Sequence, residues 1–166
     1  MKKGYFIIGG IAVAFVVMLI FLATLAEQEY TQSQGLEVKI STAKDTYSSG
    51  EPIVVDVQLN NIGNQKIQVL DLIILENYPY TFDIIDANGD RIDFLGFEIM
   101  FDYEDNHFVI LNPGQSLVHQ VNLKVDEYGV PRYNLNIPGT YSVTATYWPP
   151  FERTFVDSNI IMITLQ

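Results

Sequence analysis

The sequence has no cysteine, only two histidines and few basic residues, with nine Lys and Arg against 20 Asp and Glu and a formal net charge of −11. Without cysteine the chain can form no disulfide, no thiolate nucleophile and no thiolate metal site. His107 and His119 lie in no recognisable catalytic or zinc motif. The shortage of cations argues against the basic patch that nucleic acid requires. We therefore expect a non-enzymatic protein with no cofactor, no metal and no nucleic-acid partner.

What the chain does have is apolar side chains, since 48% of its 166 residues are hydrophobic and 13% are aromatic. A largely disordered acidic chain would have too little apolar surface to offset the entropy cost of ordering. The length allows one domain with a core of its own.

Residues 5–26 form an uncharged apolar run, with Lys2 and Lys3 before it and two glutamates soon after it. As a helix these residues would span about 33 Å, which matches a hydrocarbon core of about 30 Å. The two lysines place residues 1–4 in the cytoplasm by the positive-inside rule. We predict a single-pass transmembrane helix over 5–26, with the remaining chain extracytoplasmic at the cell membrane.

Two other interpretations of the N-terminus stay open. The stretch 24–26 is a passable cleavage site, so the apolar run could be a secretory signal that releases a secreted inhibitor or ligand-binding domain. Residues 2–4 (KKG) before an apolar helix resemble the processing site of archaeal type IV pilins and archaellins. That resemblance implies a pilin-like or archaellum-associated subunit whose helix packs in a filament.

After residue 26 the pattern changes to a polar tether over 27–35 and then to repeated two-residue alternation over 36–166. Alternation of apolar and polar residues is typical of half-buried strands, and clusters of Gly, Pro, Asn and Asp between the strands predict turns. The sequence therefore predicts an all-β antiparallel sandwich of about eight or nine strands, with the uniformly apolar segment 67–75 as a central strand. The predicted strands are 36–40, 53–59, 67–75, 80–85, 91–95, 107–111, 117–125, 141–147 and 160–165.

Four turn and strand motifs resemble those of bacterial and archaeal extracytoplasmic immunoglobulin-like (Ig-like) modules. They are 47–52 (YSSGEP), 60–63 (NNIG), 111–116 (LNPGQS) and 138–143 (PGTYSV). The resemblance implies an Ig-like β-sandwich in which Tyr141 forms a tyrosine corner. The absence of the cysteine pair and core tryptophan of antibody domains excludes that branch.

A fifth segment, 80–89 (YTFDIIDANG), resembles the Bacillus-type intracellular proteinase inhibitor domain, although no reactive-site signature accompanies it. In the same segment Asp86, Asn88 and Asp90 have the every-second-residue spacing of a calcium loop. The glycine and distal glutamate of an EF-hand are missing there. The favoured interpretation is a hairpin turn, with Asp and Asn chosen for their conformations.

Aromatic side chains are the candidates for binding a partner, because they bury much area at small entropic cost. Packing across an end of the sandwich is the alternative. In an Ig-like topology the loop before the last strand lies at the same end as the N-terminus, and 126–134 forms the outer tip. The sequence thus predicts a membrane-anchored module that binds an envelope protein or its own copies. The candidate residues are Tyr147, Trp148, Pro149, Pro150, Phe151, Phe97, Phe101 and Tyr103.

Overall fold

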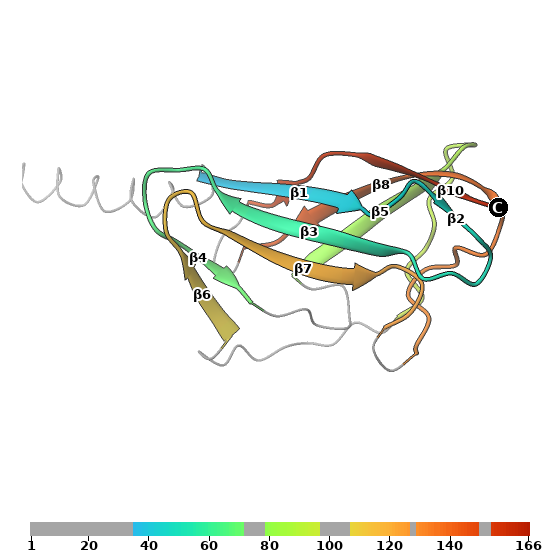
Figure 1. Ribbon diagram of the computed structural model, residues 1–166, viewed down its shortest axis with the longest axis horizontal. Helices are drawn as coiled ribbons and strands as arrows, with labels where there is room; N and C mark the ends of the chain where they lie inside the picture. Colours follow the sequence, from blue (N-terminus) through green and yellow to red (C-terminus); the bar gives the residue numbers. More distant parts are fainter. Residues whose placement is uncertain (1–34, 72–78, 97–106, 127–128, 150–153) are drawn as a thin grey trace, which may run out of the picture. The chain divides into compact units, whose positions relative to one another are not determined.

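The computed structural model describes residues 35–71, 79–96, 107–126, 129–149 and 154–166, and the named elements of this part are all β-strands (Figure 1). The strands are β1 (Leu36–Thr42), β2 (Thr46–Tyr47), β3 (Val54–Asn61), β4 (Ile67–Leu70), β5 (Tyr80–Asp86), β6 (Phe108–Leu111), β7 (Ser116–Asn122), β8 (Gly139–Tyr147), β9 (Val156–Asp157) and β10 (Ile161–Leu165).

The predicted transmembrane helix over 5–26 and most of the predicted tether, residues 27–34, lie outside the described residues. Within the described ranges no helix has the length and apolar character needed to cross a bilayer.

The strands form a β-sandwich with an Ig-like strand order. One sheet has the order β1-β3-β7, and a second has β2-β10-β8-β5 with β9 also paired to β8. Every pairing is antiparallel except that of β2 with β10. With β1, β3 and β7 as strands A, B and E and with β5, β8 and β10 as C, F and G, the order is that of an Ig-like sandwich.

The core lies between the two sheets and follows the predicted alternation. In β3 the side chains of Val55, Val57 and Leu59 are fully buried, while the residues between them are half-buried. The facing sheet contributes Ile84 from β5 and Val143 from β8. Hydrophobic burial along these two-residue repeats is therefore what sets the register of the strands.

Tyr141 forms the predicted tyrosine corner. Its ring is buried at the beginning of β8, and its hydroxyl donates a 2.7 Å hydrogen bond to the carbonyl of Ile137, four residues upstream. Burial also raises the pKa of Tyr141 above its ordinary value. The hydrogen bond fixes the turn that leads into the strand, so this prediction is confirmed.

Two predicted strands differ from the structure. The segment 67–75 is not a central strand, because β4 ends at Leu70 and pairs with β6 alone; residues 72–75 lie outside the described part. The segment 91–95 makes only isolated bridges, from Arg91 to Ile85 and from Phe94 to Tyr133. Apolar content indicates burial, but the packing of the surrounding chain decides whether a partner strand is within reach.

The side chain of Asn159 links the two sheets of the sandwich by bonding to β1. The backbone N–H of Ile40 in β1 donates to Asn159 Oδ1 at 2.9 Å, and Asn159 Nδ2 donates to the Ile40 carbonyl at 3.0 Å. Asn159 lies in the break between β9 and β10, where Ser158 also exchanges two hydrogen bonds with Ala145. The Asn159 side chain thus hydrogen-bonds the outward-facing backbone N–H and carbonyl of Ile40, as a neighbouring strand would do.

We expect Asn159→Ala to lower the free energy of unfolding by about 2 kcal/mol, because both backbone groups of Ile40 lose their partner. Thermal unfolding followed by circular dichroism measures the loss. Asn64→Ala, at an exposed turn position, is the matched control and should leave the transition unchanged. Equal transitions for the two variants would show that the amide does not hold the sheets together.

The two ends of the sandwich carry different turns and connecting segments. The N-terminal end, where Gly35 leads into β1, carries the turn after β3, the turn before β7 and the end of β8 (Figure 1). The C-terminal end, where Gln166 lies, carries the turn after β5 and the segment 123–138 between β7 and β8 (Figure 1). The end of β8, where the predicted loop begins, therefore lies at the N-terminal end; residues 150–153 of that loop lie outside the described part.

Candidate interaction sites

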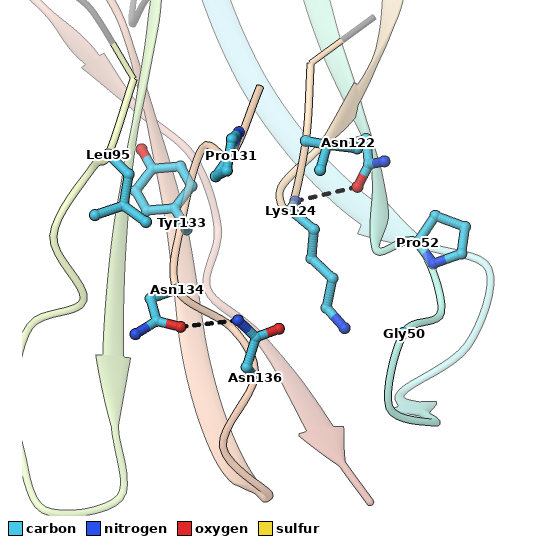
Figure 2. Close-up of a pocket in the computed structure, with 10 residues that line it drawn as sticks. Gly50, Pro52, Leu95, Asn122, Lys124, Pro131, Tyr133, Asn134 and Asn136 are labelled. Carbon is cyan, nitrogen blue, oxygen red and sulfur yellow. Dashed lines mark hydrogen bonds between the residues drawn. The ribbon is translucent and has the colours of Figure 1, made fainter. Parts of the chain in front are cut away.

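A cleft of about 310 Å³ opens at the C-terminal end of the sandwich (Figure 2). Three segments distant in sequence line it: the turn before β3, the chain around Leu95, and the end of β7 with the segment that follows it. Its lining residues are Gly50, Pro52, Leu95, Asn122, Lys124, Val125, Pro131, Tyr133, Asn134 and Asn136. An apolar wall with a few placed polar groups is typical of a binding cleft.

The polar groups of the cleft are three amides and one ammonium. Asn122 Oδ1 accepts from the backbone N–H of Lys124 at 3.1 Å, and Asn134 Oδ1 accepts from Asn136 Nδ2 at 3.0 Å (Figure 2). These bonds leave the Nδ2 groups of Asn122 and Asn134 as donors and Oδ1 of Asn136 as an acceptor. The cleft can therefore both donate to and accept from a polar ligand such as a peptide backbone.

The floor of the cleft is rigid because Tyr133 is anchored. The Tyr133 hydroxyl donates to the Phe82 carbonyl at 3.1 Å, and its ring packs edge-on against Phe94 at 5.3 Å between centroids. Burial raises the pKa of Tyr133 to about 12, so its hydroxyl stays protonated and hydrogen-bonded at physiological pH. A fixed floor lowers the ordering cost of binding.

At the opposite end, Trp148 and Phe155 form an exposed aromatic pair. Their ring centroids are 5.5 Å apart, and 43% of Trp148 and 55% of Phe155 is exposed. Trp148 extends β8, with its backbone N–H donating to the Pro79 carbonyl and its indole N–H to Thr81 Oγ1 at 3.4 Å. The pair therefore lies on the outward side of the β5-β8-β9 sheet.

Of the other predicted binding candidates, two are buried and the rest lie outside the described residues. Tyr147 is fully buried; the Leu70 N–H donates to its hydroxyl at 3.0 Å, and its ring lies 5.3 Å from that of Tyr80. Its side chain is thus part of the core, since the alternation of β8 points Tyr147 inward and Trp148 outward. Pro149 is also buried. Pro150, Phe151, Phe97, Phe101 and Tyr103 lie outside the described residues.

The calcium candidates Asp86, Asn88 and Asp90 lie in the turn after β5, as the hairpin interpretation predicts. Asp86 Oδ1 accepts from the backbone N–H groups of Asn88 (2.8 Å) and Asp90 (2.9 Å), and Gly89 adopts a φ of 89° that favours glycine. The N–H of Asp90, followed by those of Asn88, holds the pKa of Asp86 below its ordinary value. The carboxylate thus stabilises the turn itself.

His119 lies at a buried position in β7, and both its ring nitrogens have partners. Nδ1 lies 2.8 Å from the Tyr80 hydroxyl, and Nε2 lies 3.0 Å from Asp71 Oδ1. Burial raises the pKa of Tyr80 above its ordinary value. The hydrogen-bonded side chains of Tyr80, His119 and Asp71 fix the edge of the core. His107, beside β6, accepts from the Asp71 N–H through its carbonyl.

The sequence did not identify the cleft or Phe155. The cleft draws its residues from three distant segments, which no local pattern joins. One local signal was present: Asn134 and Asn136 are two residues apart, which in extended chain places both amides on one side. Residues 150–153, which separate Trp148 and Pro149 from Thr154 and Phe155, lie outside the described part, and only the structure pairs Phe155 with Trp148.

No family model matches the chain, and no curated protein matches it. Among solved structures, it is similar to the CARDB domain of the PF1109 protein from Pyrococcus furiosus, solved in complex with di-metal ions. The identity is 17%, over 78% of this chain and 91% of that one, with a TM-score of 0.39.

A second similar structure is the β-glucosidase from Listeria innocua in complex with gluconolactone, at 12% identity and a TM-score of 0.40, over 78% of this chain and 16% of that one. This chain therefore spans a small part of the glucosidase. The resemblance of 80–89 to the proteinase inhibitor domain stays a prediction. The strand order of the structure itself defines the class: an Ig-like β-sandwich module.

Proposed function

We propose that the protein is a membrane-anchored, extracytoplasmic and non-enzymatic Ig-like module that binds an envelope protein or a second copy of itself. The observation that carries the binding role is the cleft at the C-terminal end, with its apolar wall and its amide donors and acceptor. An anchored module would present this end to a partner, because Gly35 lies at the other end (Figure 1). The apolar run 5–26 after two lysines supports the anchor.

The charge distribution is compatible with a specific partner rather than general adhesion. A net charge of −11 repels anionic polymers and disfavours unspecific contacts with them. Lys124 is the cation of the cleft, while Glu51 nearby is engaged by Lys44, whose ammonium holds the pKa of Glu51 below its ordinary value. A peptide segment with a carboxylate or carbonyl oxygen for Lys124 and a polar backbone for the amides fits this lining.

The anchoring is tested on intact cells. Protease added outside should digest residues 36–166 without permeabilisation, and the mature chain should retain Lys2, Lys3 and the apolar run 5–26. A mature chain that begins at Tyr5 would instead indicate processing of the pilin kind, and a chain that begins near Glu27 and is recovered in the medium would indicate a cleaved signal. Protection of the domain until permeabilisation would reverse the proposed orientation.

The binding role is tested by placing a photo-cross-linking residue at Asn136 in the full chain. We expect a cross-linked product in intact cells, with doubled mass if the partner is a second copy. Gln58, half-buried on the outward side of β3, is the matched control and should give none. Lys124→Glu should reduce the yield from Asn136 several-fold because it reverses the one charge of the lining. Equal yields at both positions would contradict a site in the cleft.

A further inference from the structure

The N-terminal end of the sandwich exposes apolar side chains from separate segments. Ile62, in the turn after β3, is 65% exposed, and its N–H donates to the Gly35 carbonyl at 2.7 Å. The aromatic pair of Trp148 and Phe155 lies at the same end, after β8 and before β9. Indole rings with one hydrogen-bonding edge are enriched where hydrocarbon meets water. This end thus has the side chains of a membrane–water interface.

The described turns of the N-terminal end carry few charged side chains. Those of the C-terminal end carry carboxylates beside cations: Asp45, Glu51, Asp86, Asp90 and Asp126 with Lys44, Arg91, Lys124 and Arg132. The described segments of the N-terminal end, residues 61–66, 112–115, 148–149 and 154–155, contain no Asp or Glu. They do contain Lys66, which is exposed and takes part in none of the ion pairs formed among the described residues. Glu37, which lines one hollow together with Ile62, is paired with Lys39. The described turns of this end therefore add little repulsion toward an anionic surface.

The length of chain before Gly35 places a limit on how far this end can stand from a bilayer. Residues 27–35 separate the apolar run from β1, and a fully extended chain of that length reaches about 32 Å at most. A flexible chain is on average much shorter than its full extension. An anchored sandwich is thus held within reach of the lipid headgroups.

We propose that the N-terminal end rests on an anionic bilayer surface, with Ile62, Trp148 and Phe155 in the headgroup layer and Lys66 against lipid phosphates. The proposal depends on the membrane anchoring proposed above. Apolar and aromatic burial supplies contact area, and a single lysine adds attraction that falls off within a Debye length. The contact would hold the cleft at the opposite end pointing outward.

Trp148 is the chain's single tryptophan, so its fluorescence reports on this contact without interference. The full chain is reconstituted into phosphatidylcholine vesicles containing phosphatidylglycerol, and flotation establishes that it is anchored. Lipids brominated near the headgroup should then quench Trp148, and acrylamide in the water should quench it less than in detergent. The emission maximum should shift to shorter wavelength, as expected for a ring that leaves water.

Paired variants identify the contact surface. Ile62→Ser with Lys66→Glu should abolish most of the quenching by brominated lipid. Ile137→Ser is the matched control, since Ile137 is equally exposed (66%) but lies at the C-terminal end, before β8. In that variant, brominated lipid should quench Trp148 as it does in the natural chain. All three substitutions are at exposed positions, so the thermal unfolding of both variants should stay the same as that of the natural chain. Thermal unfolding therefore distinguishes loss of the membrane contact from loss of the fold.

The outcomes separate the two proposals. A chain that floats with vesicles while Trp148 remains open to acrylamide and unaffected by brominated lipid overturns the docking and leaves the anchor standing. A chain that does not float overturns the anchor, and the docking falls with it. Trp148 that is protected only at high protein-to-lipid ratio, without lipid quenching, would show that the aromatic pair contacts a second copy instead, which also overturns the docking.

Discussion

Asn61→Asp is expected to lower the free energy of unfolding by about 4 kcal/mol. Asn61 is 1% exposed, and its Nδ2 donates both to the Gln65 carbonyl at 2.7 Å and to the Leu111 carbonyl at 2.8 Å. An aspartate is nearly the same size but has no donor for either carbonyl. A carboxylate would therefore lie buried against two carbonyl oxygens.

The backbone around Asn61 cannot move away to relieve this contact. Its N–H donates to the Gln115 carbonyl, and its carbonyl accepts from the Gly114 N–H. Its Oδ1 accepts from the Gly63 N–H at 3.0 Å, and a Cβ on Gly35 would lie only 3.0 Å from Gly63 Cα. The asparagine thus joins β3 to the turns on both sides of it, in a region packed too closely to rearrange.

Thermal unfolding tests this prediction, with a fall in Tm of about 10 °C or more expected for Asn61→Asp. Asn64→Asp introduces the same charge in the same turn at an exposed position, and it should change Tm little. A small, equal effect of the two substitutions would mean that the Asn61 hydrogen bonds contribute nothing to stability.

Tyr147→Ala is expected to cost about 4 kcal/mol, whereas Trp148→Ala should cost less than about 1 kcal/mol. The reason is the inward position of Tyr147, which is fully buried, packs against Tyr80 and accepts from the Leu70 N–H. Removing the ring would leave a large cavity between the sheets, whereas the neighbouring ring of Trp148 is already partly in water.

Tyr147→Phe separates packing from hydrogen bonding at the same position. It keeps the ring but removes the acceptor of the Leu70 N–H, so we expect a cost of about 1 to 2 kcal/mol. Chemical denaturation of the three variants gives the order Tyr147→Ala, Tyr147→Phe, Trp148→Ala. If Trp148→Ala destabilised the domain as much as Tyr147→Ala, the aromatic pair would be part of the fold rather than a contact surface.

The sequence could predict elements whose evidence is local. Alternation in 36–40, 53–59 and 141–147 fixed the type and the inward face of β1, β3 and β8, because a strand with one buried face repeats every two residues. The glycine and proline of 138–143 indicated the turn that Tyr141 secures. The strands β2 and β9, each two residues long, are too short to produce a repeat.

Local evidence failed where a residue's role depends on distant chain. Tyr147 is aromatic and lies beside Trp148, so composition placed both in one candidate surface; the pleat of β8 sends them to opposite sides. The apolar segment 67–75 indicated a central strand, but β4 is paired with β6 alone and is supported through Leu70 by a tyrosine 77 residues away. Asn159 looks like an ordinary turn residue until β1 lies beside it.

By itself, the sequence determined an all-β domain without thiol chemistry, since the chain has no cysteine and two-residue periodicity is typical of strands. Only the tertiary structure decided which end of the sandwich holds which surface. In the sandwich the end of β8 lies at the same end as the beginning of β1, and the cleft lies at the other end (Figure 1). Those juxtapositions follow from strand order, which long-range hydrophobic burial selects and no short stretch of sequence contains.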